Sequence, residues 1–288
     1  MSENIVYING DYVPETEAKL SIFDRGLLFA DAVYEGFGVL DGQIVDFIYH
    51  MHRLEGSLSK LNIPMNFTVD EMFHALMRLI DANKAQNGFL YLHVTRGEGG
   101  RAFHYHDAYV PNIFAFIQGE KFAVDAPATM IDLLSYPDLR WARRDIKSTN
   151  LLAQVMAKQA ASQSGAFEAL MVDDAGFVTE AGSSSFFIIK DKALFVRPVS
   201  NEILHGITRQ TMLRVADEHK IKLVERNYTL DEVFAADEAL ITASSIYVMP
   251  VGKVDGKTIA DGKAGAFTTA LRAGYLAKAR AEFYVPES

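Results

Sequence analysis

The chain has 288 residues, of which 49% are hydrophobic and 23% charged, as in folded globular proteins and unlike disordered or collagen-like chains. Its 28 Lys and Arg against 37 Asp and Glu leave a net charge of −9, which argues against nucleic acid as a partner because proteins that bind it present a basic face. Cysteine is absent, which excludes disulfides, thiol nucleophiles and cysteine-ligated metals. The start MSENIVYINGDYVPE lacks the pattern of a signal peptide, and no apolar run approaches the ~20 residues of a membrane span, so we expect a soluble, cytoplasmic protein without a membrane partner.

Turn residues divide the chain into short apolar strands. Asn9-Gly10 follows the strand-like residues 5–8 and predicts a hairpin, because Asn-Gly readily adopts the positive φ angles of a tight turn. Asp41-Gly42 repeats this pattern, and further turns are expected at residues 174–176, 190–192 and 255–256. Other strand candidates are residues 89–96, 112–119, 130–135, 168–174, 184–190, 193–198 and 238–245.

Helices are predicted from capping residues and from apolar spacing. Thr68 and Thr229 are each followed three residues later by glutamate, which is the pattern of a capping box, and the first should open a helix to about residue 87. Further helices are expected over residues 48–61, 207–220 and 264–282.

Helices inserted irregularly among the strands favour an α+β fold. We expect a smaller N-terminal α/β domain over residues 1–120 and a larger C-terminal α/β domain over 121–288, with a ligand in the cleft between them.

Two segments carry residues suited to acid–base or amine chemistry. Lys147 lies in LRWARRDIKSTNLL beside several arginines, which would lower the pKa of its amine, although a surface basic patch explains the same pattern. Glu180 lies in FVTEAGSSSFF, where it could pair with a cationic ligand nitrogen or be a solvated hairpin residue.

Two further segments suit an anionic ligand. Gly206, Ile207 and Thr208 begin a predicted helix, whose free N–H groups and hydroxyl could bind phosphate or be simply capped. Arg53 could grip phosphate with two hydrogen bonds or be a solvated helix residue, and no residues are proposed as metal ligands. An amine, an acid for a ring nitrogen and a phosphate cradle are together what a pyridoxal phosphate site requires.

Several ordered segments extend this argument over nearly the whole chain: SIFDRGLLFADAVYEG, HRLEGSLSKL, VTRG, RWARRDIKSTNLLA, VTEAGSSSFFIIKD, ILHGITRQ and ITASS. In them the chain resembles the fold-type IV, or class IV, pyridoxal-phosphate aminotransferases, and within these the D-amino-acid transaminases, chiefly through DAVYE, RW-x-RRDIKS-x-NLL and GITR. The resemblance implies a two-domain fold, a homodimer, and ping-pong transfer of an amino group from a D-amino acid to a 2-oxo acid such as 2-oxoglutarate or pyruvate.

The resemblance also implies which residues bind the cofactor, pyridoxal 5′-phosphate. Lys147 matches the catalytic lysine that forms the internal aldimine and moves the substrate's α-proton. Glu180 matches the carboxylate that keeps the pyridine nitrogen protonated, and Arg53 matches an arginine that binds the phosphate. The remaining implied contacts are Ile207, Thr208 and Ser244 with the phosphate and Leu204 with the face of the ring.

The substrate-side residues separate the branches of the family. Tyr34 matches a tyrosine near the substrate, and Arg101 matches the arginine of a carboxylate trap. Phe103 stands where that trap has a histidine, and His104 follows it, so an (R)-selective amine transaminase is an alternative. Leu152 stands where branched-chain aminotransferases usually have a tyrosine, which speaks against that branch. An aminodeoxychorismate lyase would use the same cofactor, and, outside enzymes, a phosphate-ligand binding protein would share the same fold.

Overall fold

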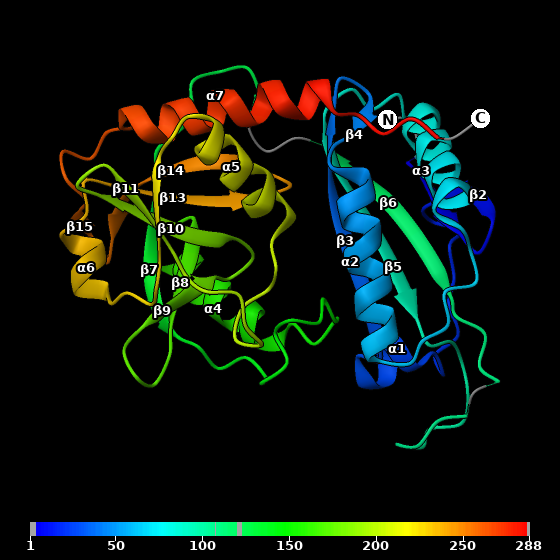
Figure 1. Cartoon of the computed structure of the whole chain (residues 1–288). Coiled ribbons are helices and arrows are strands. Elements are labelled where there is room, and N and C mark those ends of the chain that lie inside the picture. The colour runs from blue at the N-terminus through cyan, green and yellow to red at the C-terminus, as the bar shows by residue number, and fades with distance from the viewer. Residues whose placement is uncertain (1–3, 107, 120–122, 287–288) are drawn as a thin grey trace. The chain divides into compact units, whose positions relative to one another are not determined.

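The computed structural model describes residues 4–106, 108–119 and 123–286, and the chain divides into two compact units (Figure 1). The first comprises Met1–Lys121, Ile146–Asn150 and Glu282–Ser288, and the second comprises Phe122–Asp145 and Leu151–Ala281. The sequence-based division assigned residues 146–150 and 282–286 to the second domain, whereas their contacts group them with the first unit. Lys147 is therefore a residue of the first unit.

The first unit is built on a six-stranded antiparallel sheet in the order β2-β1-β6-β5-β3-β4. Its strands are β1 (Ile5–Ile8), β2 (Asp11–Pro14), β3 (Ala32–Leu40), β4 (Gln43–Ile44), β5 (Gly88–Thr95) and β6 (Ile113–Gly119). Its helices are α1 (Arg25–Phe29), α2 (Phe47–Lys60) and α3 (Val69–Asn83). Side chains alternate along β5, so Leu90, Leu92 and Val94 are buried, while Tyr91 and His93 point to the opposite face.

The second unit contains a nine-stranded mixed sheet in the order β12-β11-β10-β13-β14-β7-β8-β9, with β15 paired to β14. Its strands are β7 (Ile131–Pro137), β8 (Glu168–Val172), β9 (Val178–Ala181), β10 (Ser185–Lys190), β11 (Ala193–Val196), β12 (Lys222–Glu225), β13 (Glu238–Ala243), β14 (Tyr247–Val254) and β15 (Lys257–Thr258). Its helices are α4 (Leu152–Gln163), α5 (Ile207–Glu218), α6 (Leu230–Phe234) and α7 (Ala266–Ala281). The α5 and α7 helices pack on each other and on β13 and β14, and α4 packs on β7 and β8.

The predicted helices, strand candidates and hairpin turns are present in the described part of the chain. The capping box at Thr68 is confirmed, because its hydroxyl accepts a 3.2 Å hydrogen bond from the Glu71 amide and the Glu71 carboxylate accepts one of 2.7 Å from the Thr68 amide. Asn9 and Gly10 have φ angles of 49° and 104°, which confirms the hairpin turn. The α1 and α4 helices and strands β12, β14 and β15 were not predicted. Within the described residues, no helix has the length and apolar character needed to cross a membrane.

Candidate active site

The segment that carries Lys147 pairs with the start of β3 in the first unit. The Tyr34 amide donates a 3.0 Å hydrogen bond to the Lys147 carbonyl, and the Thr149 amide donates one of 3.1 Å to the Ala32 carbonyl. The Lys147 amide donates to the Ser57 hydroxyl of α2 at 3.2 Å. This pairing brings the Lys147 Nζ to 4.1 Å from the centre of the Tyr34 ring. The structure thus joins two of the predicted site residues, with the amine over the face of the ring.

Arg53 on α2 forms an ion pair with Glu35 on β3, which the sequence analysis did not identify. Its Nε and Nη2 donate to the two Glu35 carboxylate oxygens at 2.8 and 2.7 Å, and the Nδ1 of His50 lies 2.7 Å from the same carboxylate. Glu35 is fully buried, and burial acts to raise its pKa, but the charge and hydrogen bonds of Arg53 and His50 outweigh this and hold the pKa well below its ordinary range. Glu35 therefore fixes the orientation of Arg53.

Aromatic side chains cover the sheet face that carries Tyr34. The Tyr34 and Tyr91 rings stack with centroids 5.3 Å apart, Tyr91 and Phe116 are 4.9 Å apart, and His93 and Phe114 are 4.4 Å apart. Burial lowers the pKa of His93 to about 4, so this imidazole is neutral at physiological pH. Lys147 therefore stands at one end of an uncharged aromatic surface.

The predicted substrate residues Arg101, Phe103 and His104 lie between β5 and β6. The Arg101 guanidinium is 5.6 Å from the centre of the Phe29 ring, and the Phe29 and Phe103 ring centroids are 5.5 Å apart. The Phe103 side chain is 82% exposed. Among the described residues, no hydrogen bond, ion pair or ring contact joins this group to Tyr34 or to the lysine beside it.

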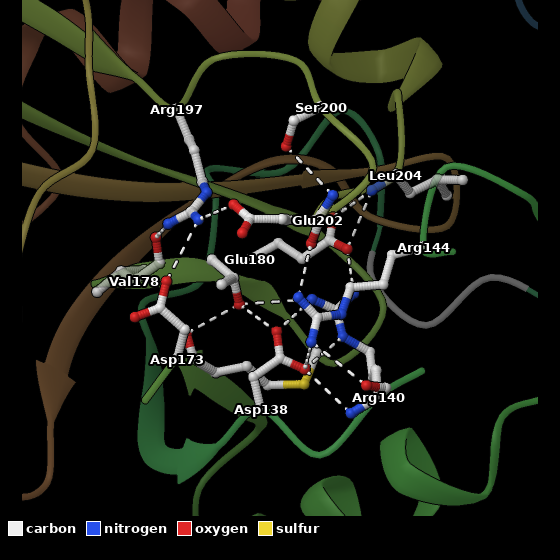
Figure 2. Close-up of polar contacts among 12 residues, drawn as sticks. Asp138, Arg140, Arg144, Asp173, Val178, Glu180, Arg197, Ser200, Glu202 and Leu204 are labelled. Carbon is white, nitrogen blue, oxygen red and sulfur yellow. Dashed lines mark hydrogen bonds and ion pairs between the residues drawn. The ribbon is translucent and has the colours of Figure 1, made fainter. Parts of the chain in front are cut away.

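Glu180, at the end of β9 in the second unit, is buried in a network of charges (Figure 2). The Leu204 amide donates to its carboxylate at 3.1 and 3.3 Å, and Arg140 donates a short hydrogen bond to the same carboxylate. Arg140 also donates to Asp138 from Nε at 2.9 Å and from Nη2 at 2.7 Å. Burial raises the pKa of the Glu180 carboxyl, although Arg140 and the Leu204 amide oppose the change. Glu180 is therefore a buried carboxylate held in one orientation rather than a solvated hairpin residue.

The start of α5 offers hydrogen-bond donors to an anion. Gly206 is its N-cap and, having no side chain, supplies no cap to the following amides of Ile207 and Thr208. A Cβ at Gly206 would lie 2.7 Å from the Ser185 hydroxyl, so the residue lets the chain pass close to β10. The Thr242 hydroxyl on β13, the strand on which α5 packs, is buried without a hydrogen-bond partner among the described residues. Ser244 follows the end of β13. Helix amides and hydroxyls of this kind suit a phosphate group.

Comparison with known proteins identifies the family. Residues 32–254 match the family model described as amino-transferase class IV. The chain belongs to the class IV aminotransferases.

This class IV aminotransferase is 35% identical over 271 residues to the D-alanine aminotransferase of Staphylococcus epidermidis. The aligned region covers 94% of this chain and 96% of that protein. It is 36% identical over 281 residues to the D-alanine aminotransferase of Bacillus licheniformis, covering 95% of this chain and 98% of that protein. Among solved structures, the branched-chain amino acid aminotransferase of Escherichia coli superposes with a TM-score of 0.90 at 22% identity, covering 96% of this chain and 95% of that chain. The predicted α+β, fold-type IV architecture is confirmed.

As a class IV aminotransferase, the protein is a pyridoxal-phosphate-dependent enzyme. Its described residues fit that cofactor. The first unit has an amine at Lys147 and a fixed guanidinium at Arg53, while the second has a buried carboxylate at Glu180 and the phosphate donors at the start of α5. Membership of this family also sets aside the hypothesis of a non-catalytic phosphate-binding protein.

Sequence reasoning missed the partners that hold the charged site residues. Glu35 occupies one of the inward positions of β3, between Val33 and Phe37, and an acid in such a position needs a buried cation. The alternation of side chains along β3 could therefore have indicated that Glu35 is buried and needs a cationic partner such as Arg53. Arg140, by contrast, is separated from Glu180 by 40 residues, and no local pattern links them.

Proposed function

We propose that this aminotransferase moves the amino group of a D-amino acid, such as D-alanine, to a 2-oxo acid acceptor, 2-oxoglutarate or pyruvate, by a ping-pong mechanism. The observation that carries the proposal is the match, over 94% of the chain, to a D-alanine aminotransferase at 35% identity. A branched-chain aminotransferase or an aminodeoxychorismate lyase would use the same cofactor, and the experiment below separates them.

In the first unit, Lys147 is the proposed catalytic residue. Bound pyridoxal phosphate supplies an electron sink conjugated to the substrate's α-carbon. The Lys147 Nζ, which lies 4.1 Å from the centre of the Tyr34 ring, would take and hold the proton from that carbon. Arg53 binds the cofactor phosphate, and its ion pair with Glu35 keeps the guanidinium in place.

In the second unit, Glu180 accepts a hydrogen bond from the protonated pyridine nitrogen. The Leu204 amide and Arg140 hold the carboxylate in one orientation, which suits it to accept such a hydrogen bond. We assign Leu204 to the ring face, and its amide also orients the Glu180 carboxylate. Ile207, Thr208 and Ser244 bind the phosphate.

On the substrate side, Tyr34 and Arg101 are proposed to bind the carboxylate of the amino acid, with His104 beside them. Phe103 supports a second candidate function. It places an exposed aromatic ring 5.5 Å from the Phe29 ring, where an imidazole would offer a hydrogen-bond donor. An apolar surface at this position also suits a primary amine without a carboxylate, so an (R)-selective amine transaminase is the alternative.

We also propose that the enzyme is a homodimer and that it is located in the cytoplasm. Several apolar side chains of the first unit are exposed in a single chain: Ile22 by 70%, Leu27 by 71%, Phe103 by 82% and Val110 by 72%. Leu139, Leu152 and Val155 of the second unit are exposed as well, and exposed apolar side chains favour association with a second copy.

The test is the visible spectrum of the holoenzyme before and after separate additions of D-alanine, L-leucine and (R)-1-phenylethylamine. We expect D-alanine to bleach the cofactor band and 2-oxoglutarate or pyruvate to restore it. A Lys147→Ala control should load the cofactor yet show no turnover. Bleaching by L-leucine or by the amine alone would overturn the D-amino-acid proposal in favour of that branch, and pyruvate release from aminodeoxychorismate without an acceptor would indicate the lyase.

A further inference from the structure

We propose that Arg25 and Arg96, joined through Asp31, are positioning residues that fix the backbone of residues 101–106 and thereby place Arg101 and Phe103 for the substrate. The inference rests on the substrate roles given above to those two residues. The three anchoring residues belong to the first unit and lie outside the groups assigned to the cofactor or the substrate.

Arg25 supplies hydrogen bonds to three consecutive carbonyls of this segment. Its Nη1 donates to the Ala102 carbonyl at 2.7 Å and to the His104 carbonyl at 3.5 Å, and its Nη2 donates to the Phe103 carbonyl at 3.2 Å. Arg25 is the first residue of α1 and is only 3% exposed. A buried guanidinium must use its donors on protein groups, so this arrangement favours one path of the segment.

Asp31 and Arg96 complete this arrangement, and we call Arg25, Asp31 and Arg96 together the anchor. One Asp31 oxygen accepts from the Nε atoms of both Arg25 and Arg96, each at 2.8 Å, and the other accepts from Arg96 Nη2 at 3.0 Å. Arg96 also donates to the Leu61 and Asn62 carbonyls at 2.6 and 2.9 Å, which ties the anchor to the end of α2. Burial acts to raise the pKa of Asp31, but the two guanidinium groups outweigh it and the pKa lies below its ordinary value. The anchor is thus charged over the whole physiological pH range.

A side-chain contact between Tyr105 and Arg96 also holds residues 101–106. The ring of Tyr105 lies 3.6 Å from the Arg96 guanidinium, a stacking geometry typical of arginine. Residues 101–106 form no helix or strand, so these contacts with side chains of the anchor replace the backbone ladder that orders β5 and β6. The fixed carbonyls place Arg101 and Phe103 around the Phe29 ring, which lies on the same short helix as Arg25.

Arg25→Lys tests the proposal, because lysine keeps the charge opposite Asp31 but cannot span several carbonyls. In the holoenzyme we expect the KM for D-alanine to rise about tenfold, with kcat within about twofold, since loss of charge-assisted binding acts on substrate affinity. In an Arg101→Ala background the same change should alter KM by no more than about twofold, because residues acting through one group are not additive. If the effects of Arg25→Lys and Arg101→Ala on KM instead multiply, the proposal is overturned. In that case Arg25→Lys acts through a structural defect that does not involve Arg101.

The rate of trypsin cleavage after Arg101, followed by mass spectrometry, measures how firmly the anchor holds residues 101–106, and it does so independently of enzyme activity. We expect cleavage about tenfold faster in Arg25→Lys than in the wild type, because cleavage follows the population of the open segment. Arg78→Lys, at an exposed α3 residue stacked on Tyr12 at 4.4 Å, is the matched control and should change neither cleavage nor KM. Unchanged cleavage in Arg25→Lys would overturn the anchor.

Tyr105→Leu provides a second variant if Arg25→Lys does not fold, and it should accelerate cleavage after Arg101 in the same direction. A wild-type enzyme that does not use D-alanine would refute the proposed function, while the cleavage rates would still decide whether the anchor holds the segment.

Discussion

Replacing Glu35 with glutamine tests how the structure holds Arg53. The carboxylate is fully buried and accepts two hydrogen bonds from Arg53, at 2.8 and 2.7 Å, with the His50 Nδ1 at 2.7 Å. Glutamine preserves the shape but removes the negative charge, and its amide N–H groups face a donor. The Arg53 guanidinium, 11% exposed, is then left without its buried counterion.

Breaking a buried ion pair by removing one partner costs about 3–5 kcal/mol. At about 2–4 °C per kcal/mol for a chain of this size, Glu35→Gln should lower Tm by about 6–20 °C. The loss should depend on pH. The folded-state pKa of Glu35 lies below its unfolded value of about 4.3, so its contribution to stability is full above that value and is lost as pH falls below it.

Thermal and urea unfolding of the holoenzyme at pH 7 and at decreasing pH would measure both effects. Glu71→Gln is the matched control, because this exposed carboxylate serves a capping box in which glutamine also functions, so its cost should stay under about 1 kcal/mol. A Glu35→Gln enzyme within about 1 kcal/mol of the wild type, or a stability difference that does not narrow in acid, would refute this account of the ion pair.

Two further substitutions probe the second unit. Arg140→Met removes the cation between Glu180 and Asp138, so it should destabilise the enzyme by about 3–5 kcal/mol and slow bleaching of the cofactor band by D-alanine. Wild-type stability and bleaching rate would contradict the role of that cation. Thr208→Val removes a buried hydroxyl at the start of α5 and should weaken pyridoxal phosphate binding to the apoenzyme about tenfold in a fluorescence titration. Thr211→Val, also buried and one turn later, is its control, and equal affinities for the two variants would exclude a phosphate contact from Thr208.

Local interactions explain why most elements could be predicted from the sequence. The hairpin at Asn9-Gly10 requires only the φ preferences of two residues, and the start of α3 requires only Thr68 and Glu71. The α4 helix was missed because the signal was weak. Its buried residues are Ala157 and Ala161, so it shows no wide apolar stripe, and it lacks a side-chain N-cap.

The site was predictable where a motif names the residue and not where distant residues pair. Lys147 and Glu180 stand out through their flanking segments, which resemble a known family. Their environments depend on tertiary pairing: β3 carries Tyr34 to Lys147, and the loop after the second unit's β7 carries Arg140 to Glu180. Burial makes such partners obligatory, but the choice of partner follows from the folded topology and not from local sequence.

Arg53 and Glu180 share one arrangement, in which each is held by a buried group of opposite sign. Glu35 neutralises Arg53, and Arg140 neutralises Glu180, so each pair adds little net charge to its surroundings. Such pairing reduces stability relative to apolar packing, yet it fixes the direction of the hydrogen-bonding atoms before a ligand binds. Because the Glu35 charge already balances Arg53, that arginine cannot alone compensate a phosphate dianion. In the second unit, the start of α5 has no side-chain cap among the described residues, so its amides and partial positive charge suit an anion.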